Sequence, residues 1–125
     1  MVNPFADQKK FMRACDQTTD GTLDEKQFAL YRNLIAEEVG ELNDAIENND
    51  RVEQLDALID ILVVTIGAIH SMGADSEGAW KEVLQTNLAK IDTKTGKVIK
   101  RKDGKVLKPR GWRAPNLAPF LENQN

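Results

Sequence analysis

The stretch LDALIDILVVTIGAI, residues 55–69, is long and apolar enough to form the central helix of a bundle. Between Ala57 and Ile69 the only side chains that are neither apolar nor glycine are Asp60 and Thr65. An ionised carboxylate is costly in a protein interior unless it is paired, protonated or bound to a metal. Asp60 therefore indicates that partners for its charge lie elsewhere in the chain.

Length and composition predict a single soluble globular domain, since 125 residues with 41% hydrophobic and 30% charged side chains suit one modest core. No uninterrupted apolar stretch reaches the ~18 residues of a membrane span. The N-terminus lacks the apolar segment of a signal peptide. Because Cys15 is the single cysteine, no internal disulfide can form. We therefore expect a cytoplasmic protein without membrane contact.

The net charge of −3 conceals an uneven distribution along the chain. Residues 1–89 carry 17 acidic and 7 basic side chains, whereas residues 90–113 carry 10 basic and 2 acidic ones. An acidic body with a basic appendage suggests a polyanionic ligand, met by metal on one side and by Lys and Arg on the other. A solvated basic tail is the alternative.

Capping signals and apolar periodicity predict four helices. They are expected from about Pro4 to Cys15, from a capping box at residues 22–25 to Asn48, from Asp50 to Gly73, and from Asp75 or Ser76 to Ile91. Because the third is apolar on almost every side, we expect it at the centre of a bundle or in a subunit interface. We therefore also expect a homodimer or homotetramer.

The chemistry of the chain changes after the fourth helix. The basic segment GKVIKRKDGKVLK, residues 96–108, has Asp103-Gly104 at its centre, which is a signal for a tight β-hairpin. We therefore expect an all-α bundle of about four helices with a C-terminal β-hairpin and an irregular tail. The helical body would span residues 4–91 and the hairpin and tail residues 92–125 of one domain.

Acidic residues gather on the two central helices. Glu37, Glu38 and Glu41 lie close together on the second helix, and Asp56 and Asp60 share a face of the third. A short turn joins these helices, so they should pack antiparallel and bring the carboxylates together. No Lys or Arg lies on the matching faces. Oxygen ligands without a counter-cation predict a hard divalent ion, Mg²⁺ first, with Mn²⁺ or Ca²⁺ next.

Two polar residues stand out on the fourth helix. We expect the core to include the apolar stripe of this helix, which consists of Trp80, Val83, Leu84, Leu88 and Ile91. Asn87 occupies an apolar position of this stripe and Lys90 follows one turn later, so the pair could bind phosphate oxygens or a base edge. An ordinary interhelical hydrogen bond is the alternative for Asn87. A di-iron site is excluded because Gly67 stands three residues before the only histidine, His70, where Glu is needed. We expect His70 to be a packed histidine.

Taken together, these motifs resemble a known family. LIAEEVGELNDAI (34–46), the apolar stretch 55–69, NLAKID (87–92) and the basic segment resemble the MazG-like all-α nucleotide pyrophosphohydrolases. The nearest branch is the phosphoribosyl-ATP pyrophosphohydrolase-like proteins common in bacterial viruses. The similarity runs from about Leu30 to Pro109. It implies Mg²⁺-dependent hydrolysis of a nucleoside triphosphate to the monophosphate and pyrophosphate.

The resemblance also implies roles for individual residues. Metal ligands would be Glu38, Glu41 and Asp60, with Glu37 and Glu38 acting on the attacking water. Asn87, Lys90 and Lys105 would lie near the phosphate chain, together with some of Lys97, Lys100 and Arg101.

One position departs from the family pattern. Much of the family has an acidic residue three before the aspartate, but here that residue is Ala57. Asp56 faces almost the same way and would serve as the fourth metal ligand.

Two other functions stay open at this stage. A nucleotide-binding or regulatory protein without turnover fits Ala57 as a mark of a decayed site. A nucleic-acid-binding helical protein is disfavoured because the basic segment lacks interleaved aromatic residues, with Trp112 alone nearby.

Overall fold

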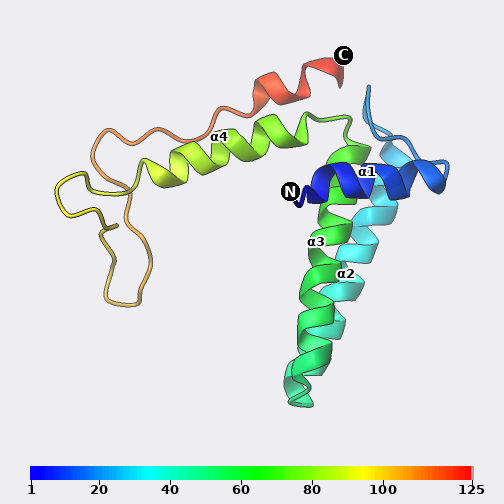
Figure 1. The fold of residues 1–125 in the computed structure, drawn as a ribbon, viewed down its shortest axis with the longest axis horizontal. Coiled ribbons are helices and arrows are strands. Elements are labelled where there is room, and N and C mark those ends of the chain that lie inside the picture. Colours follow the sequence, from blue (N-terminus) through cyan, green and yellow to red (C-terminus); the bar gives the residue numbers. More distant parts are fainter. Residues whose placement is uncertain (125) are drawn as a thin grey trace.

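The computed structural model describes residues 1–124 and contains four α-helices and a terminal 3₁₀ helix (Figure 1). They are α1 (Pro4–Ala14), α2 (Glu25–Glu47), α3 (Arg51–Ser71), α4 (Ser76–Leu88) and η1 (Ala118–Gln124). The predicted all-α class and the predicted order of helices are confirmed. Asn125, the last residue of the predicted tail, lies outside the described residues.

Local capping sets where most helices begin. The side chains of Asn3, Asp50 and Asp75 each accept a hydrogen bond from the backbone N–H three residues later, and Pro4 occupies the first helical position of α1. At the other end of α3, Gly73 adopts a φ of 70°, the left-handed conformation that ends helices. These boundaries follow from nearby residues, so the sequence predicted them.

The capping box predicted at residues 22–25 is wrong. Asp24 caps α2, and its side chain accepts a hydrogen bond of 3.0 Å from the backbone N–H of Gln27. The reason is that Asp24, two residues nearer the helix than Thr22, has the spacing that a cap needs, and its backbone N–H also donates to the carbonyl oxygen of Ser71 at the end of α3. Asp24 has the extended conformation that is usual for a residue preceding the first turn of a helix.

The core forms where α1 crosses the antiparallel pair of α2 and α3 (Figure 1). Met12, Tyr31 and Ala68 are its buried centre. Partly buried apolar residues of α2 and α3 pack around them: Phe28, Leu34, Ile35 and Val64. This small core lies at the end of the helix pair away from the turn at residues 48–50.

The fourth helix does not join the bundle along its length. α4 departs from α3 at a bend of 115° and projects away from the other helices with the C-terminal segment beside it (Figure 1). The expected burial of its stripe is therefore wrong, since Trp80 is 59% exposed and Leu84 and Leu88 are exposed as well. The spacing of apolar residues predicts which face of a helix is apolar, but it does not predict which other element packs against that face.

The apolar third helix is also uncovered over much of its surface. Leu55, Leu58, Ile59 and Leu62 are exposed, the last at 57%. In a single chain α3 is therefore not central to the bundle, and its apolar face is free to meet another surface. Among the described residues no single helix is long and apolar enough to cross a membrane, and α3 with α4 meets those criteria only jointly, across their bend.

The predicted C-terminal β-hairpin is wrong. Within residues 1–124 the structure contains no strand, and the basic segment shows only two isolated antiparallel bridges, Ile91 with Val98 and Lys100 with Val106. A turn does form at Asp103-Gly104, where Gly104 has a φ of 92°. An exposed two-stranded hairpin with little buried apolar surface is too weakly stabilised to extend these bridges into a ladder.

His70 is packed, as predicted, and lies 1% exposed beneath α1. Its Nε2 lies 2.9 Å from the carbonyl oxygen of Phe5, so this nitrogen carries the hydrogen, and Nδ1 is buried without a partner. Burial lowers the pKa of His70 below its ordinary 6.5. The hydrogen bond with Phe5 and the charge of Asp20 oppose this effect, whereas the charges of Lys9 and Arg13 add to it. A proton on this ring is therefore unfavourable in the folded state.

We expect the free energy of unfolding to fall as the pH drops through 6.5. Above that value the ring is neutral in both states; below it, the unfolded chain takes up a proton that folded His70 does not, which costs up to about 1.4 kcal/mol per pH unit. Urea unfolding of wild type and His70→Gln between about pH 8 and pH 5 measures this. The difference in the free energy of unfolding between wild type and the variant should shrink as the pH falls, because His70 is the only titrating group in which the two proteins differ. A difference independent of pH would contradict the prediction.

Candidate functional site

The acidic residues are positioned by the close packing of α2 on α3. Small residues allow the two helices to approach at both ends of the contact. Ala45 and Ala57 are buried near the turn, and Gly67 lies directly against the ring of Tyr31 at the far end. The carboxylates of α2 and α3 lie between these two contacts.

Glu38 is the most perturbed of these groups. Its side chain is partly buried, and its Oε2 atom is buried without a hydrogen-bond partner. A hydrogen bond with the Glu41 carboxyl, followed by desolvation and by the charges of Glu41, Asp60 and Asp56, raises the pKa of Glu38 to about 7. Four of the residues predicted from sequence are therefore close enough to interact strongly.

Asp60 is partly buried on α3 and faces the same charges. Burial is the first cause that raises its pKa, followed by the charges of Asp56 and Glu41. No cation offsets these effects, because the ion pairs found among the described residues involve only Asp20 and Asp103 as acids. The aspartate that interrupts the apolar stretch thus shares its surroundings with other carboxyls and not with Lys or Arg.

The donor set fits a hard divalent cation. Every donor is a carboxylate oxygen, one of these oxygens is buried without a partner, and two carboxyls have raised pKa values. A bound cation would remove each of these penalties. In the conformation described for residues 1–124, no three acidic, histidine or cysteine side chains are arranged to hold one ion. Coordination therefore needs a rearrangement of side chains or a contribution from another molecule.

Glu37 lies apart from these groups. It is exposed on α2, and it is not among the charges that raise the pKa of Glu38 or Asp60. Ala57, where the family pattern has a carboxylate, is 3% exposed in the contact with α2, so a longer acidic side chain would not fit there. The neighbouring Asp56 is exposed and contributes its charge to the group instead.

Asn87 and Lys90 are paired with each other at the end of α4, where the Nζ of Lys90 donates to the Oδ1 of Asn87 at 3.1 Å. They are distant from the carboxylates of the same chain. At 1.5 Å per residue, Asp60 and Asn87 each lie ~16 Å along their helices from the bend. With a bend of 115° they are separated by on the order of 18 Å. Lys105 lies farther along, in the exposed turn at Asp103-Gly104.

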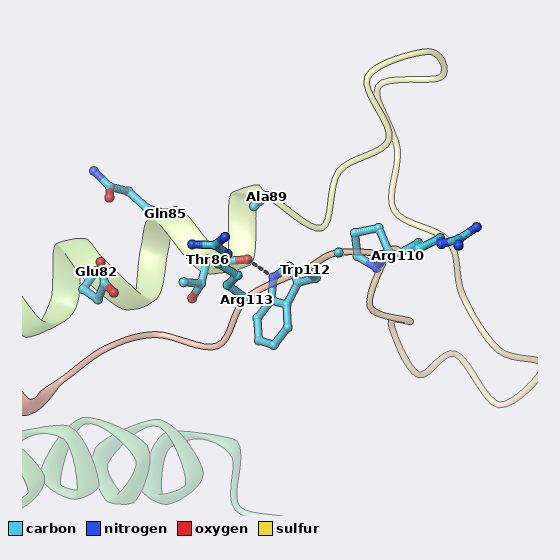
Figure 2. A pocket seen from close by; sticks show the side chains of 9 residues that line it. Glu82, Gln85, Thr86, Ala89, Arg110, Trp112 and Arg113 are labelled. Atoms are coloured by element: carbon cyan, nitrogen blue, oxygen red, sulfur yellow. Dashed lines mark hydrogen bonds between the residues drawn. The ribbon is translucent and has the colours of Figure 1, made fainter.

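A pocket of about 400 Å³ lies between α4 and the C-terminal segment, and we call it the tail pocket (Figure 2). It is lined by Glu82, Gln85, Thr86, Ala89, Pro109, Arg110, Gly111, Trp112 and Arg113. In the sequence Trp112 stands out only as the one aromatic residue near the basic segment, and its neighbours were not predicted to form a site. The clustering of basic residues around a tryptophan in KPRGWR, residues 108–113, was the available signal.

Comparison with known proteins adds one positive finding. The family model described as phosphoribosyl-ATP pyrophosphohydrolase matches residues 8–87, more than half of the chain. The match includes the acidic residues of α2 and α3 discussed above and Asn87, and it ends before Lys90, Lys105 and the C-terminal wall of the tail pocket. No curated protein matches the chain.

Proposed function

The chain belongs to the phosphoribosyl-ATP pyrophosphohydrolase family, whose members hydrolyse phosphoanhydride bonds, and from that premise we propose that it is a Mg²⁺-dependent nucleotide pyrophosphohydrolase. Its substrate would be a nucleoside or deoxynucleoside triphosphate, or a related nucleotide, which it converts to the monophosphate and pyrophosphate. The observation that carries this proposal is the convergence of Glu38, Glu41, Asp56 and Asp60, none of which forms an ion pair with Lys or Arg among residues 1–124.

The same residues suggest how the reaction proceeds. Glu38, Glu41, Asp56 and Asp60 would hold Mg²⁺, with Mn²⁺ as a substitute. When bound, the ion supplies positive charge against the phosphate oxygens and lowers the pKa of water. A water attacks the α-phosphorus, the bond from that phosphorus to the bridging oxygen breaks, and pyrophosphate leaves.

Proton transfer and charge neutralisation fall to side chains of the protein. The carboxylate of Glu37 or Glu38 accepts the proton of the attacking water. On the leaving side, the amide of Asn87 and the ammonium group of Lys90 bind the phosphate chain. Lys105 would add charge for the departing pyrophosphate.

Release of pyrophosphate from a panel of nucleoside and deoxynucleoside triphosphates, with Mg²⁺ and with chelator, tests the proposed function. We expect release that depends on the metal and on Asp60. Metal-dependent stabilisation by nucleotide without release would instead support a binding protein, the alternative that Ala57 favours.

We also propose that a second copy of the chain completes the site. The separation of Asn87 and Lys90 from the carboxylates of their own chain supports this, as do the exposed apolar faces of α3 and α4. In such a homodimer or homotetramer, α4 of one copy lies over the carboxylates of another.

Complementation between inactive variants should reveal a shared site. Asp60→Asn damages the metal-binding half of the site and Lys90→Gln damages the phosphate-binding half. In a mixed dimer both substitutions fall in one site, so the other site is intact. Co-expression of both should therefore recover about a quarter of wild-type activity per subunit. Sites built within one chain would recover none beyond the mean of the two variants, and that result, or a monomer by light scattering, contradicts the proposed assembly.

A further inference from the structure

Specific hydrogen bonds hold the C-terminal segment against α4 and so form the tail pocket. Trp112 donates from its Nε1 to the carbonyl oxygen of Thr86 at 2.7 Å (Figure 2). Thr86 lies in the last turn of α4, where carbonyl groups lack helical partners. The carbonyls of Gln85, Asn87 and Leu88 accept from the backbone N–H groups of residues 89–91. Trp112 therefore satisfies a carbonyl at the end of the helix and holds the segment against it.

A tight turn presents this tryptophan. The backbone N–H of Trp112 donates to the carbonyl oxygen of Pro109 at 3.1 Å. Between them, Gly111 has a φ of 80°, which is the conformation that the third position of a type II turn requires. The turn places Arg110 and Arg113 on either side of Trp112 in the wall of the pocket.

Positive charge surrounds Trp112. The Nζ atoms of Lys90 and Lys108 lie 5.0 Å and 5.1 Å from the centre of its ring. Arg110 and Arg113 line the pocket itself, the two lysines lie at the ring of its Trp112, and none of these four cations forms an ion pair within the described residues.

One carboxylate also lines the pocket. Glu82 accepts a hydrogen bond of 2.7 Å at its Oε2 from the backbone N–H of Asn116, so this oxygen already has a partner. The net charge around the pocket is therefore positive.

We propose that the tail pocket binds a polyphosphate group, such as pyrophosphate or the di- or triphosphate of a nucleotide. Guanidinium groups match phosphate oxygens in geometry and charge, and the volume of the pocket admits such a ligand. Because two ammonium groups already lie over the ring of Trp112, an oxyanion fits the pocket better than a stacked base. Only the identity of the ligand rests on the proposed function. The residues that make the pocket basic lie beyond the part of the chain that the family model matches.

Tryptophan fluorescence can report on this pocket directly. The chain has two tryptophans, so Trp80→Phe leaves Trp112 as the single reporter. In chelator, where the carboxylates hold no metal, titration with pyrophosphate should change the emission of Trp112 saturably. A second protein with Arg110→Gln and Arg113→Gln should bind pyrophosphate roughly tenfold more weakly, because two charge-assisted contacts are lost. Lys102→Gln, which removes one charge from the exposed basic segment outside the pocket, should bind like its parent.

Each result supports or overturns the assignment. Absence of a saturable change in a folded protein overturns it, as does equal weakening by Lys102→Gln, which would indicate diffuse attraction. Tighter binding of a single-stranded oligonucleotide than of pyrophosphate overturns it in favour of a nucleic-acid surface. Saturable binding of pyrophosphate by a protein that hydrolyses no nucleotide supports the pocket while the proposed function fails.

Steady-state kinetics then identify the source of the phosphate. If the pocket holds the substrate, Arg110→Gln with Arg113→Gln should raise KM roughly tenfold and leave kcat unchanged. If it holds only free pyrophosphate, both constants stay unchanged and inhibition by added pyrophosphate weakens instead. Both outcomes support a polyphosphate pocket and distinguish its ligands.

Discussion

Replacing Asp60 by Asn should lower the rate of pyrophosphate release by about 100-fold to 1000-fold. The substitution keeps the size of the side chain but removes one negative charge from the group that we propose holds Mg²⁺. A neutral amide oxygen binds a hard cation far less well than a carboxylate does. Loss of one such electrostatic contribution costs this much in comparable active sites. Release from deoxynucleoside triphosphates with saturating Mg²⁺ measures it.

The variant should remain folded, which separates this effect from general damage. The pKa of Asp60 is raised, so the folded state binds its proton more tightly than the unfolded chain does. Ionisation of Asp60 therefore lowers stability as the pH rises above 3.8, and a neutral Asn avoids that loss at neutral pH. Without metal, Asp60→Asn should melt no lower than wild type. Mg²⁺ should raise the melting temperature of wild type more than that of the variant.

Asp16→Asn is a matched control for the chemistry of the substitution. Asp16 is exposed in the loop after α1 and has a φ of 58°, a conformation that Asn adopts readily. This control should retain wild-type activity. If Asp60→Asn retained it too, the carboxylates between α2 and α3 would not be the catalytic site.

Replacing Gly67 by Ala should lower the free energy of unfolding by about 3 kcal/mol. A methyl group at this position would lie 2.2 Å from Cε1 of Tyr31 and 2.7 Å from its Cζ. The ring cannot move aside easily, because it is 4% exposed in the core and its hydroxyl donates to Gln17. Relief of the clash must therefore separate α2 from α3. Urea unfolding measures the loss.

Gly40→Ala provides the opposite expectation in the same pair of helices. A Cβ atom at Gly40 meets nothing within 4 Å, so only the helix propensity changes. Alanine is favoured there by about 0.5–1 kcal/mol. Equal effects of the two substitutions would show that α2 and α3 do not pack as closely at Gly67 as the structure indicates.

The helices and the candidate carboxylates were predictable because both depend on short-range patterns. Asp50 and Asp75 cap helices through bonds to residues three positions away, so a local motif was enough. The turn at residues 48–50 forces α2 and α3 to be antiparallel. Since helical spacing then sets the register, the approach of Glu38 to Asp60 followed from counting residues.

Other features could not be predicted because they depend on contacts between distant residues. The cap of α2 was itself local, since Asp24 accepts from Gln27 three residues later, but its further backbone bond to Ser71, across the molecule, was not predictable. Nothing local indicated that Trp112 would bond to Thr86, 26 residues earlier, or that a pocket would form beside them. The predicted hairpin failed for a related reason, because the basic segment is exposed along almost its whole length and gains little free energy from burial.

The sequence by itself determined four helices, their main caps and an acidic group on the central pair, because hydrogen bonds and helical periodicity act over a few residues. Only the tertiary structure decided the direction of α4, the contact of Gly67 with Tyr31 and the tail pocket. All three features depend on which apolar faces of the helices pack against each other. Free energy gained by burial depends on the partner as well as on the face, and a helical pattern specifies only the face.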